Sequence, residues 1–314
     1  MAAYVIRRVV AFPPLLLAGA ALVFLLLRVI PGDPVRGALG PDATAAQVST
    51  LRHSLGWDQP LPIQFVHWLG DLARGDLGRS LVTGQPIGTQ ITSRLPVTLE
   101  ILILAMMFST ALGVSFGLLS AIYRNQLVDH VIRVFSVASM SIPSFFALTL
   151  LIVLPARWWG YVPPLKYVPI WSSPGTNLQM FIPPVFILSL EMAAPLMRFT
   201  RSVCLDVLNQ DYIRTARSKG LSERTVILRH MMKNCSVPII TILGLRMAAL
   251  LGGTVILEQV MSLSGIGQFT YQSVISRDYG VVQVLTLYFG IVVMLSYLMV
   301  DLSYALLDPR IQYR

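Results

Sequence analysis

Long apolar runs, most of them bounded by charged residues, dominate the pattern of the sequence. An α-helix needs roughly 20 mostly apolar residues to cross about 30 Å of hydrocarbon. Six stretches qualify: 9–27, 101–123, 134–156, 178–197, 237–257 and 279–300. The fourth carries Glu191 and the fifth Arg246, and the other four contain no charge. The pattern predicts an all-α integral membrane protein with six transmembrane helices.

Composition supports this prediction. Of the 314 residues, 55% are hydrophobic and only 12% are charged. A soluble domain has about 25% charged residues, so a soluble globule of this size is excluded. Disorder is excluded as well, because the chain has ample apolar surface to bury.

The distribution of Lys and Arg predicts the orientation. With the N-terminus inside, the inner segments hold Arg7, Arg8, Arg124, Arg133, eight basic residues between 198 and 233, Arg310 and Arg314. The two short outer loops hold only Arg157, Lys166 and Arg277. By the positive-inside rule both termini are cytoplasmic, and this arrangement accounts for the net charge of +9. Cys204 and Cys235 flank the most basic stretch, which fits a reducing cytoplasmic face.

The first apolar stretch is expected to be a retained anchor. It is longer than the apolar region of a signal peptide, and no small-x-small cleavage pattern follows it.

The outer segment 31–96 contains turn residues and short amphipathic patterns. We expect helices over 44–55, with Asp42 near the N-cap and Gly56 at the end, and over 64–73. Ile87, Ile91 and Leu95 then repeat at every fourth position, which is typical of a helix on the membrane surface. The segment is either a connector over the outer mouth or a docking surface for a partner.

The cytoplasmic stretch 201–236 is too regular for a tail. Its pattern predicts one helix over 205–219, a stop at Gly220, and a second helix with Ser222 as N-cap and Glu223 in its first turn. The second helix has an apolar stripe and a basic side, formed by Val226, Ile227, Met231 and Met232 and by Arg224, Arg229 and Lys233. The stripe either packs against the protein's own helices or binds a partner.

The stretch from Asp211 through Gly220 to Pro238 resembles the EAA loop of bacterial ABC importer permeases, closest to the dipeptide, oligopeptide, glutathione and nickel branch. In that family the helix-Gly-helix forms coupling helices that sit in a groove of the ATPase subunit. The resemblance assigns ATPase coupling to Arg214, Thr215, Ala216, Gly220, Leu221 and Ser222. Arg and Thr replace the Glu and Ala that begin the general motif, and the closing proline comes late.

Further stretches resemble signatures of the same branch in order and spacing. They are Ile30-Pro-Gly-Asp-Pro34, Gly75-Asp-Leu-Gly-Arg-Ser80, Ser141-Ile-Pro143, Ser264-Gly-Ile-Gly267, Arg277-Asp-Tyr279 and Asp308-Pro309. The resemblance therefore covers the whole chain and implies the type I ABC importer permease fold. It divides the chain into a tail and first helix (1–30), an extracytoplasmic segment (31–96), a five-helix core (97–306) with coupling helices at about 203–236, and a cytoplasmic tail (307–314).

The resemblance also implies the function. The chain is expected to be a multi-pass permease subunit in the bacterial cytoplasmic (inner) membrane, importing di- or oligopeptides, with glutathione or a nickel complex as the alternative. The implied partners are a second, homologous permease subunit, two ATP-binding subunits, an extracytoplasmic substrate-binding protein and membrane lipid, with no nucleic acid. No cofactor or metal is expected in this chain, because it has no Gly-x-x-x-x-Gly-Lys-Ser/Thr loop, and ATP and Mg belong to the partner ATPases.

Charges at membrane depth form a second candidate site. An unpaired Arg in a span costs about 3 kcal/mol on insertion scales, so Arg246 must find a partner or water. Glu191 and Glu258, at the outer end of the fifth span, are the available acids. These three residues are either a tie between helices or part of the translocation path.

Two other classes of function are less well supported. An intramembrane enzyme would need catalytic residues at membrane depth, and all four histidines fall in loops. A self-contained channel or secondary transporter would suit six helices, but it has no evident use for the cytoplasmic helix pair, and the hydropathy shows no inverted repeat.

Overall fold

The computed structural model describes residues 2–29, 34–39, 42–164 and 166–307. The described chain is helical and has no strand beyond one isolated bridge between Arg79 and Pro86. The elements are α1 (Ala2–Val29), α2 (Pro34–Leu39), α3 (Ala45–Ser54), α4 (Leu61–Ala73), α5 (Ile87–Ile122), α6 (Leu127–Ser141), α7 (Ser144–Trp159), α8 (Pro174–Leu208), α9 (Asp211–Ser218), α10 (Glu223–Thr225), the π-helical η1 (Val226–Met231), α11 (Met232–Val260), α12 (Ile266–Ile275) and α13 (Tyr279–Leu307). The all-α prediction is confirmed.

Within the described residues, four helices are long and apolar enough to cross a membrane: Ile87–Ile122, Pro174–Leu208, Glu223–Val260 and Tyr279–Val300. A fifth candidate is the pair α6 and α7, which passes the same test only as a bent unit. The first predicted span lies in α1, whose apolar stretch Val10–Leu26 is shorter. The six predicted stretches thus lie in helices, with a break in the third at residues 142–143, and the count of six spans remains a prediction.

The third predicted span is not straight. α6 and α7 meet at an angle of 92° around Ile142 and Pro143. Pro143 cannot donate a helical hydrogen bond, and a residue before proline is pushed out of the α conformation. Ile142 is accordingly extended, with φ −100° and ψ 120°.

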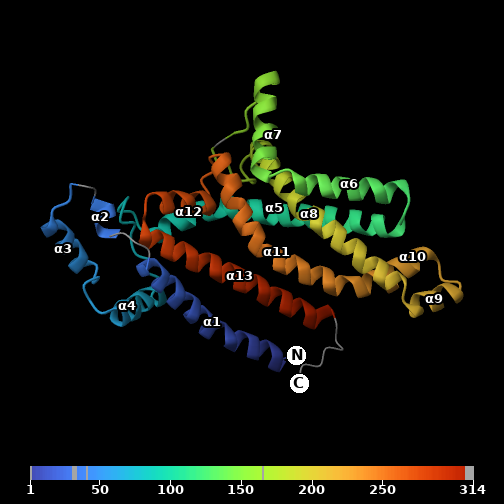
Figure 1. Ribbon diagram of the computed structural model, residues 1–314, viewed down its shortest axis with the longest axis horizontal. Helices are drawn as coiled ribbons and strands as arrows, with labels where there is room; N and C mark the ends of the chain where they lie inside the picture. Colours follow the sequence, from blue (N-terminus) through green and yellow to red (C-terminus); the bar gives the residue numbers. More distant parts are fainter. Residues whose placement is uncertain (1, 30–33, 40–41, 165, 308–314) are drawn as a thin grey trace. The chain divides into compact units, whose positions relative to one another are not determined.

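The chain divides into two compact units, and α5 and α13 contribute residues to both. In the unit formed by 99–263 and 295–314, α8 packs against α6, α7 and α11. Figure 1 shows α8 running obliquely from the junction of α6 and α7 toward α9. Gly113 and Gly117 of α5 allow close approach to α8, since a Cβ at Gly117 would lie 2.7 Å from the Met197 carbonyl oxygen.

The other unit comprises 2–98 and 264–294. Its apolar core joins Ile87 and Ile91 at the start of α5 to Phe269 of α12 and Val281 and Leu285 of α13. The predicted membrane-surface helix is therefore wrong. The stripe packs inside the protein, and its helix continues through Pro96 into the apolar part of α5.

The helix predicted over 44–55 is present as α3, and its N-cap is Thr44, two residues after Asp42. Thr44 and Gln47 form a reciprocal capping box. Gly56 ends the helix as predicted, with a left-handed φ of 65°. The second predicted helix is α4, which begins earlier, at Leu61.

Candidate functional site: the α9–α10 surface

The segment that follows α8 contains a break that the sequence pattern did not predict. The expected continuous helix over 205–219 is wrong, because α8 ends at Leu208 and α9 begins at Asp211. Gln210 between them is extended, with φ −72° and ψ 149°. The carboxylate of Asp211 then suits the positive N-terminal end of α9.

The turn at Gly220 matches the prediction. Gly220 has a left-handed φ of 77°, its N–H donates to the Arg217 carbonyl at 2.9 Å, and the Leu221 N–H donates to the Ala216 carbonyl at 3.3 Å. These two bonds form a Schellman motif, which favours glycine at this position. Ser222 is the N-cap of α10 as predicted, since its Oγ accepts a hydrogen bond from the Thr225 N–H at 3.4 Å.

The second expected helix is not a separate element. After one turn of α10 the backbone widens into η1, where the Met232 N–H donates to the Ile227 carbonyl. α11 follows without interruption, so Glu223–Val260 forms one long helical run. π-helical turns of this kind are frequent at functional sites.

The apolar stripe on this run packs against the protein itself. Val226 is fully buried with Ile213 and Ala216 of α9, and Met231 is fully buried with Cys204 and Cys235. Of the two uses left open by the sequence, the structure shows self-packing. The stripe anchors the α9–α10 pair to α8 and α11.

The opposite side of the pair is exposed. We call it the α9–α10 surface, and it comprises Arg214, Thr215, Lys219, Gly220, Leu221 and Ser222. Leu221 is 40% exposed at the turn. Ala216 is buried beneath this surface, so its role is to seat α9. Figure 1 shows α9 and α10 at one end of α8.

An ion pair fixes the angle of the turn. Arg217 donates from Nε and Nη2 to the two carboxylate oxygens of Glu223, at 2.8 Å and 3.2 Å. A bidentate pair of this kind is directional as well as attractive.

Tyr212 of α9 accepts a hydrogen bond from Asn234 at 3.1 Å. Burial raises the pKa of Tyr212, so its phenol is neutral at physiological pH.

The charges at membrane depth are not brought together as an ion pair. In the described part of the chain, Glu191 Oε2 and Arg246 Nε are buried with no hydrogen-bond partner, and no ion pair joins the two side chains. Glu191 lines an apolar cleft of about 220 Å³ between α6, α7 and α8. Glu258 is fully buried near the end of α11.

Sequence reasoning missed a buried ion pair between α6 and α8. Asp129 is completely buried, and Arg201 donates to both of its oxygens at 2.8 Å. Ser120 and the Asn125 N–H donate to the same carboxylate at 2.6 Å and 3.0 Å. The sequence offers one signal for this ion pair: Asp129 is the only acidic residue between Arg124 and Arg133.

Two of the signature stretches meet in the other unit. The hydroxyl of Ser80 donates to Asp278 Oδ2, and the Leu81 N–H lies 3.4 Å from Asp278 Oδ1. The stretches 75–80 and 277–279 are nearly 200 residues apart in sequence, and this buried contact ties the loop before α5 to the first turn of α13.

The match to known families decides the class of protein. The family described as binding-protein-dependent transport system inner membrane component matches residues 113–313, and its N-terminal counterpart matches residues 1–102. The chain belongs to this family. It is a non-catalytic permease component of an ABC transporter in the inner membrane.

Curated relatives match this permease over its full length. A probable peptide ABC transporter permease protein of Sinorhizobium fredii is 38% identical over 314 residues, covering 100% of each chain. The glutathione transport system permease protein GsiC of Salmonella typhi is 37% identical over 311 residues, covering 99% of each chain.

Solved structures share the fold. A chain of an amino acid ABC transporter, crystallised with histidines, superposes with a TM-score of 0.54 at 15% identity, covering 68% of this chain and 92% of that one. A chain of the MetNI methionine ABC transporter in an inward-facing conformation gives 0.54 at 17% identity, covering 70% and 96%. These likenesses establish the ABC importer permease fold.

Proposed function

We propose that this permease imports di- or oligopeptides, with energy supplied by ATP hydrolysis in partner subunits that dock on the α9–α10 surface. The observation that carries the proposal is the construction of this surface. Its apolar underside is buried, its turn is fixed by Gly220 and the Arg217–Glu223 pair, and its outer side chains are left exposed.

The α9–α10 surface is suited to transmit force. α9 follows directly on α8, and α10 leads through η1 into α11, so displacement of the turn acts on two long apolar helices at once. A turn held by a Schellman motif and a bidentate ion pair moves as a unit. We infer that ATP-driven closure of two ATPase subunits shifts α8 and α11 in this way.

The proposed assembly contains three kinds of partner. It comprises a second, homologous permease subunit, two ATPase subunits that hold ATP and Mg, and an extracytoplasmic binding protein that delivers the substrate. The absence of a phosphate-binding loop in the sequence supports the assignment of hydrolysis to the partners.

Glu191, Arg246 and Glu258 are proposed to contribute to the translocation path. Glu191 and Arg246 each have a buried side-chain atom with no hydrogen-bond partner among the described residues. An ionisable group left in this way at membrane depth is costly and marks a functional site by default. The absence of an ion pair between Glu191 and Arg246 in the described chain favours this role over a structural tie. Glu191 also lines the cleft between α6, α7 and α8, so its side chain is not sealed inside the protein.

Peptides are proposed as the substrate because a full-length relative carries that name at 38% identity. Glutathione, itself a tripeptide, is the second candidate, supported by the relative GsiC at 37% identity. A nickel complex is a third possibility within the branch that the sequence resembles. Uptake assays with each of these substrates distinguish the three.

Site-specific crosslinking tests the docking proposal. In a chain with Cys204→Ala and Cys235→Ala, the single substitution Lys219→Cys should form a crosslink to a co-purified ATPase subunit. Lys166→Cys, which is also exposed, is the matched control and should form none. A crosslink from position 166 with none from position 219 would place the ATPase on the wrong face and overturn the proposal.

A further inference from the structure

A cavity of about 230 Å³ lies inside the unit formed by 2–98 and 264–294. It is bordered by the end of α1, by α4, by the loop at Gly78 and by the first turns of α13. Its volume is below the roughly 300 Å³ of a drug-sized pocket, so any occupant is small. None of the residues assigned to coupling or to the translocation path lines this cavity.

Aromatic rings form one wall of the cavity. Phe24 packs against Trp68, with ring centroids 5.9 Å apart, and Trp57 lies nearby on the loop after α3. The guanidinium carbon of Arg28 lies 4.0 Å from the centre of the Phe24 ring and 5.5 Å from that of Trp57. Stacking of this kind holds a guanidinium in place and leaves its N–H edge available.

Two donors at the cavity lack a strong acceptor. Arg28 donates from Nη2 to Gln64 Oε1 at 2.9 Å, and among the described residues no carboxylate forms an ion pair with it. Gln283 is only 7% exposed, and its Nε2 has no hydrogen-bond partner in the described chain. A buried amide N–H without an acceptor is costly unless a ligand supplies one.

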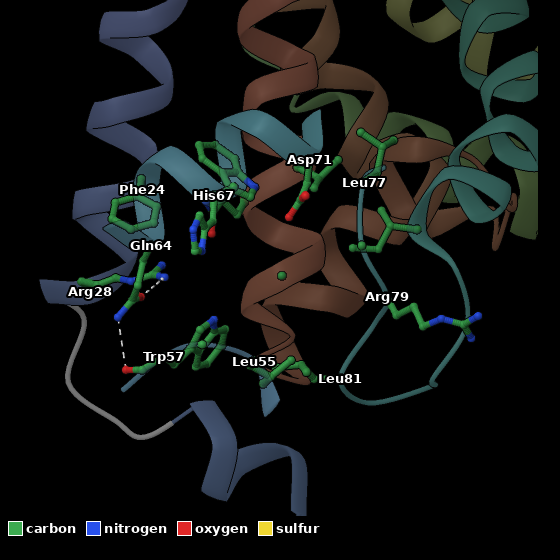
Figure 2. A pocket seen from close by; sticks show the side chains of 17 residues that line it. Phe24, Arg28, Leu55, Trp57, Gln64, His67, Asp71, Leu77, Arg79 and Leu81 are labelled. Atoms are coloured by element: carbon green, nitrogen blue, oxygen red, sulfur yellow. Dashed lines mark hydrogen bonds between the residues drawn. The ribbon is translucent and has the colours of Figure 1, made fainter. Parts of the chain in front are cut away.

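The side chain of Gln64 is held in place by further hydrogen bonds. Its Nε2 donates to the carbonyls of Trp57 at 3.1 Å and Gln59 at 2.7 Å. Figure 2 shows the bonds that link Arg28, Gln64 and Trp57. Arg28 is thus positioned by neutral groups, and its charge is not neutralised by them.

A single carboxylate lies on the other side of the cavity. Figure 2 shows Asp71 and His67 projecting from α4 toward the cavity, while Arg79 points away from it. Arg79 donates to the carbonyl of Gly84 in its own loop at 3.2 Å. The only ion pair of Asp71 among the described residues is a loose contact with Arg74 at 3.5 Å, so its carboxylate can accept a further cation.

We propose that this cavity binds a small zwitterionic ligand, with an oxyanion at Arg28 and Gln283 and an ammonium group at Asp71. The site goes beyond the proposed coupling function and does not depend on it. It places ligand recognition in the unit that holds the segment before α5.

Two sources supply this chemistry. One is a short peptide, which carries an ammonium group and a carboxylate at its ends. The other is an aminophospholipid, whose headgroup joins an ammonium group to a phosphate. α4, which borders the cavity, also carries the exposed apolar residues Leu61, Ile63 and Val66, which suit contact with acyl chains.

Tryptophan fluorescence of the full chain in nanodiscs provides the test. Trp158→Phe, Trp159→Phe and Trp171→Phe leave only Trp57 and Trp68 as emitters, both at the cavity. The peptide probe is the dipeptide Ala-Ala in nanodiscs of phosphatidylglycerol alone, with N-acetylated and C-amidated Ala-Ala as controls. The lipid probe is phosphatidylethanolamine added to the same nanodiscs without peptide.

The proposal expects a saturable change with one of the two probes. If the source is a peptide, each blocked dipeptide should bind about tenfold more weakly, because each lacks one charge-assisted contact. For either source, Arg28→Gln and Asp71→Asn should weaken the response by a similar factor, and Arg157→Gln should leave it unchanged. Arg28→Lys keeps the charge and should retain part of the response.

Absence of any response to both probes would overturn the proposal. An equal response in the wild type, Arg28→Gln and Asp71→Asn would overturn it as well, since the ligand would then bind elsewhere. Asp71 is 54% exposed, so its substitution does not put folding at risk. Because the assay needs no ATPase subunit, its failure is distinguishable from failure of the proposed coupling function.

Discussion

At the scale of single residues, the buried Asp129 carboxylate is held by four donors, two from Arg201 and one each from Ser120 and the Asn125 backbone. Loss of one partner of a buried ion pair leaves an uncompensated charge and costs about 3 kcal/mol or more. Arg201→Leu is therefore expected to lower the midpoint of thermal unfolding in detergent markedly. The double variant Asp129→Leu with Arg201→Leu should recover much of the loss.

Arg133 is the matched control for this prediction. Its Nε lies 3.5 Å from Asp129 Oδ1, and its side chain is 47% exposed. The contact is long and the Arg133 side chain is half-exposed, so Arg133→Leu should change stability by at most about 1 kcal/mol. Equal losses for Arg133→Leu and Arg201→Leu would contradict the assignment.

Arg246 and Glu191 lead to a different expectation, because the structure does not pair them. Arg246→Leu should assemble with the partner subunits and reduce uptake, and adding Glu191→Leu should rescue nothing. Co-purification and uptake measure the two effects separately. Rescue of assembly by the second substitution would establish a structural tie and remove both residues from the path.

The local signals in the sequence explain which residues could be predicted. Gly220 and Ser222 were found because a turn or a cap depends on neighbours within a few residues. The contacts of Asp129 with Arg201 and of Ser80 with Asp278 could not be found in this way. They join segments 72 and 198 residues apart, and such pairing depends on tertiary packing.

At the scale of elements, the closest approach of α5 to α8 depends on residues without side chains. A Cβ at Gly117 would lie 2.6 Å from Thr200 Cβ and 2.7 Å from the Met197 carbonyl oxygen. Backbone cannot move aside cheaply, so Gly117→Ala is expected to cost about 1–3 kcal/mol of stability. Unfolding of the purified chain in detergent measures it.

Gly252→Ala is the control for Gly117→Ala. Gly252 also lies inside a helix, and a Cβ there would meet nothing within 4 Å. Alanine has the higher helix propensity, so this variant should be neutral or slightly more stable. Destabilisation of both variants to the same extent would show that close packing of α5 on α8 is not the cause.

Apolar periodicity located the long elements but not their breaks. The run 134–156 is apolar throughout, and only the tertiary structure shows that Pro143 turns it through 92° instead of kinking it slightly. The break at Asn209–Gln210 carries no proline or glycine signal. An apolar stripe such as Ile87 and Ile91 has the same spacing whether it faces lipid or protein. Only the tertiary structure shows that this one packs against α12 and α13.

At the scale of the whole molecule, charge asymmetry predicts the topology. In a chain with Cys204→Ala and Cys235→Ala, a membrane-impermeant thiol reagent added to intact cells should label Asp58→Cys and Lys166→Cys. It should label Lys219→Cys only after the membrane is opened, because the basic α9–α10 segment is expected to be cytoplasmic. Labelling of position 219 in intact cells would reverse the orientation.

The central claim is that ATP hydrolysis in partner subunits drives transport through the turn at Gly220. The most direct measurement is dipeptide uptake into proteoliposomes that contain the complete transporter, with ATP hydrolysis recorded in parallel. Gly220→Leu places a Cβ at a φ of 77°, a strain of about 1–2 kcal/mol, while Gly220→Asn tolerates that conformation better. We expect ATP-dependent uptake in the wild type. In Gly220→Leu, the complex should still assemble but lose both uptake and substrate-stimulated ATP hydrolysis. In Gly220→Asn, both activities should be partly retained. Uptake that proceeds without ATP, or wild-type coupling in Gly220→Leu, would contradict the account.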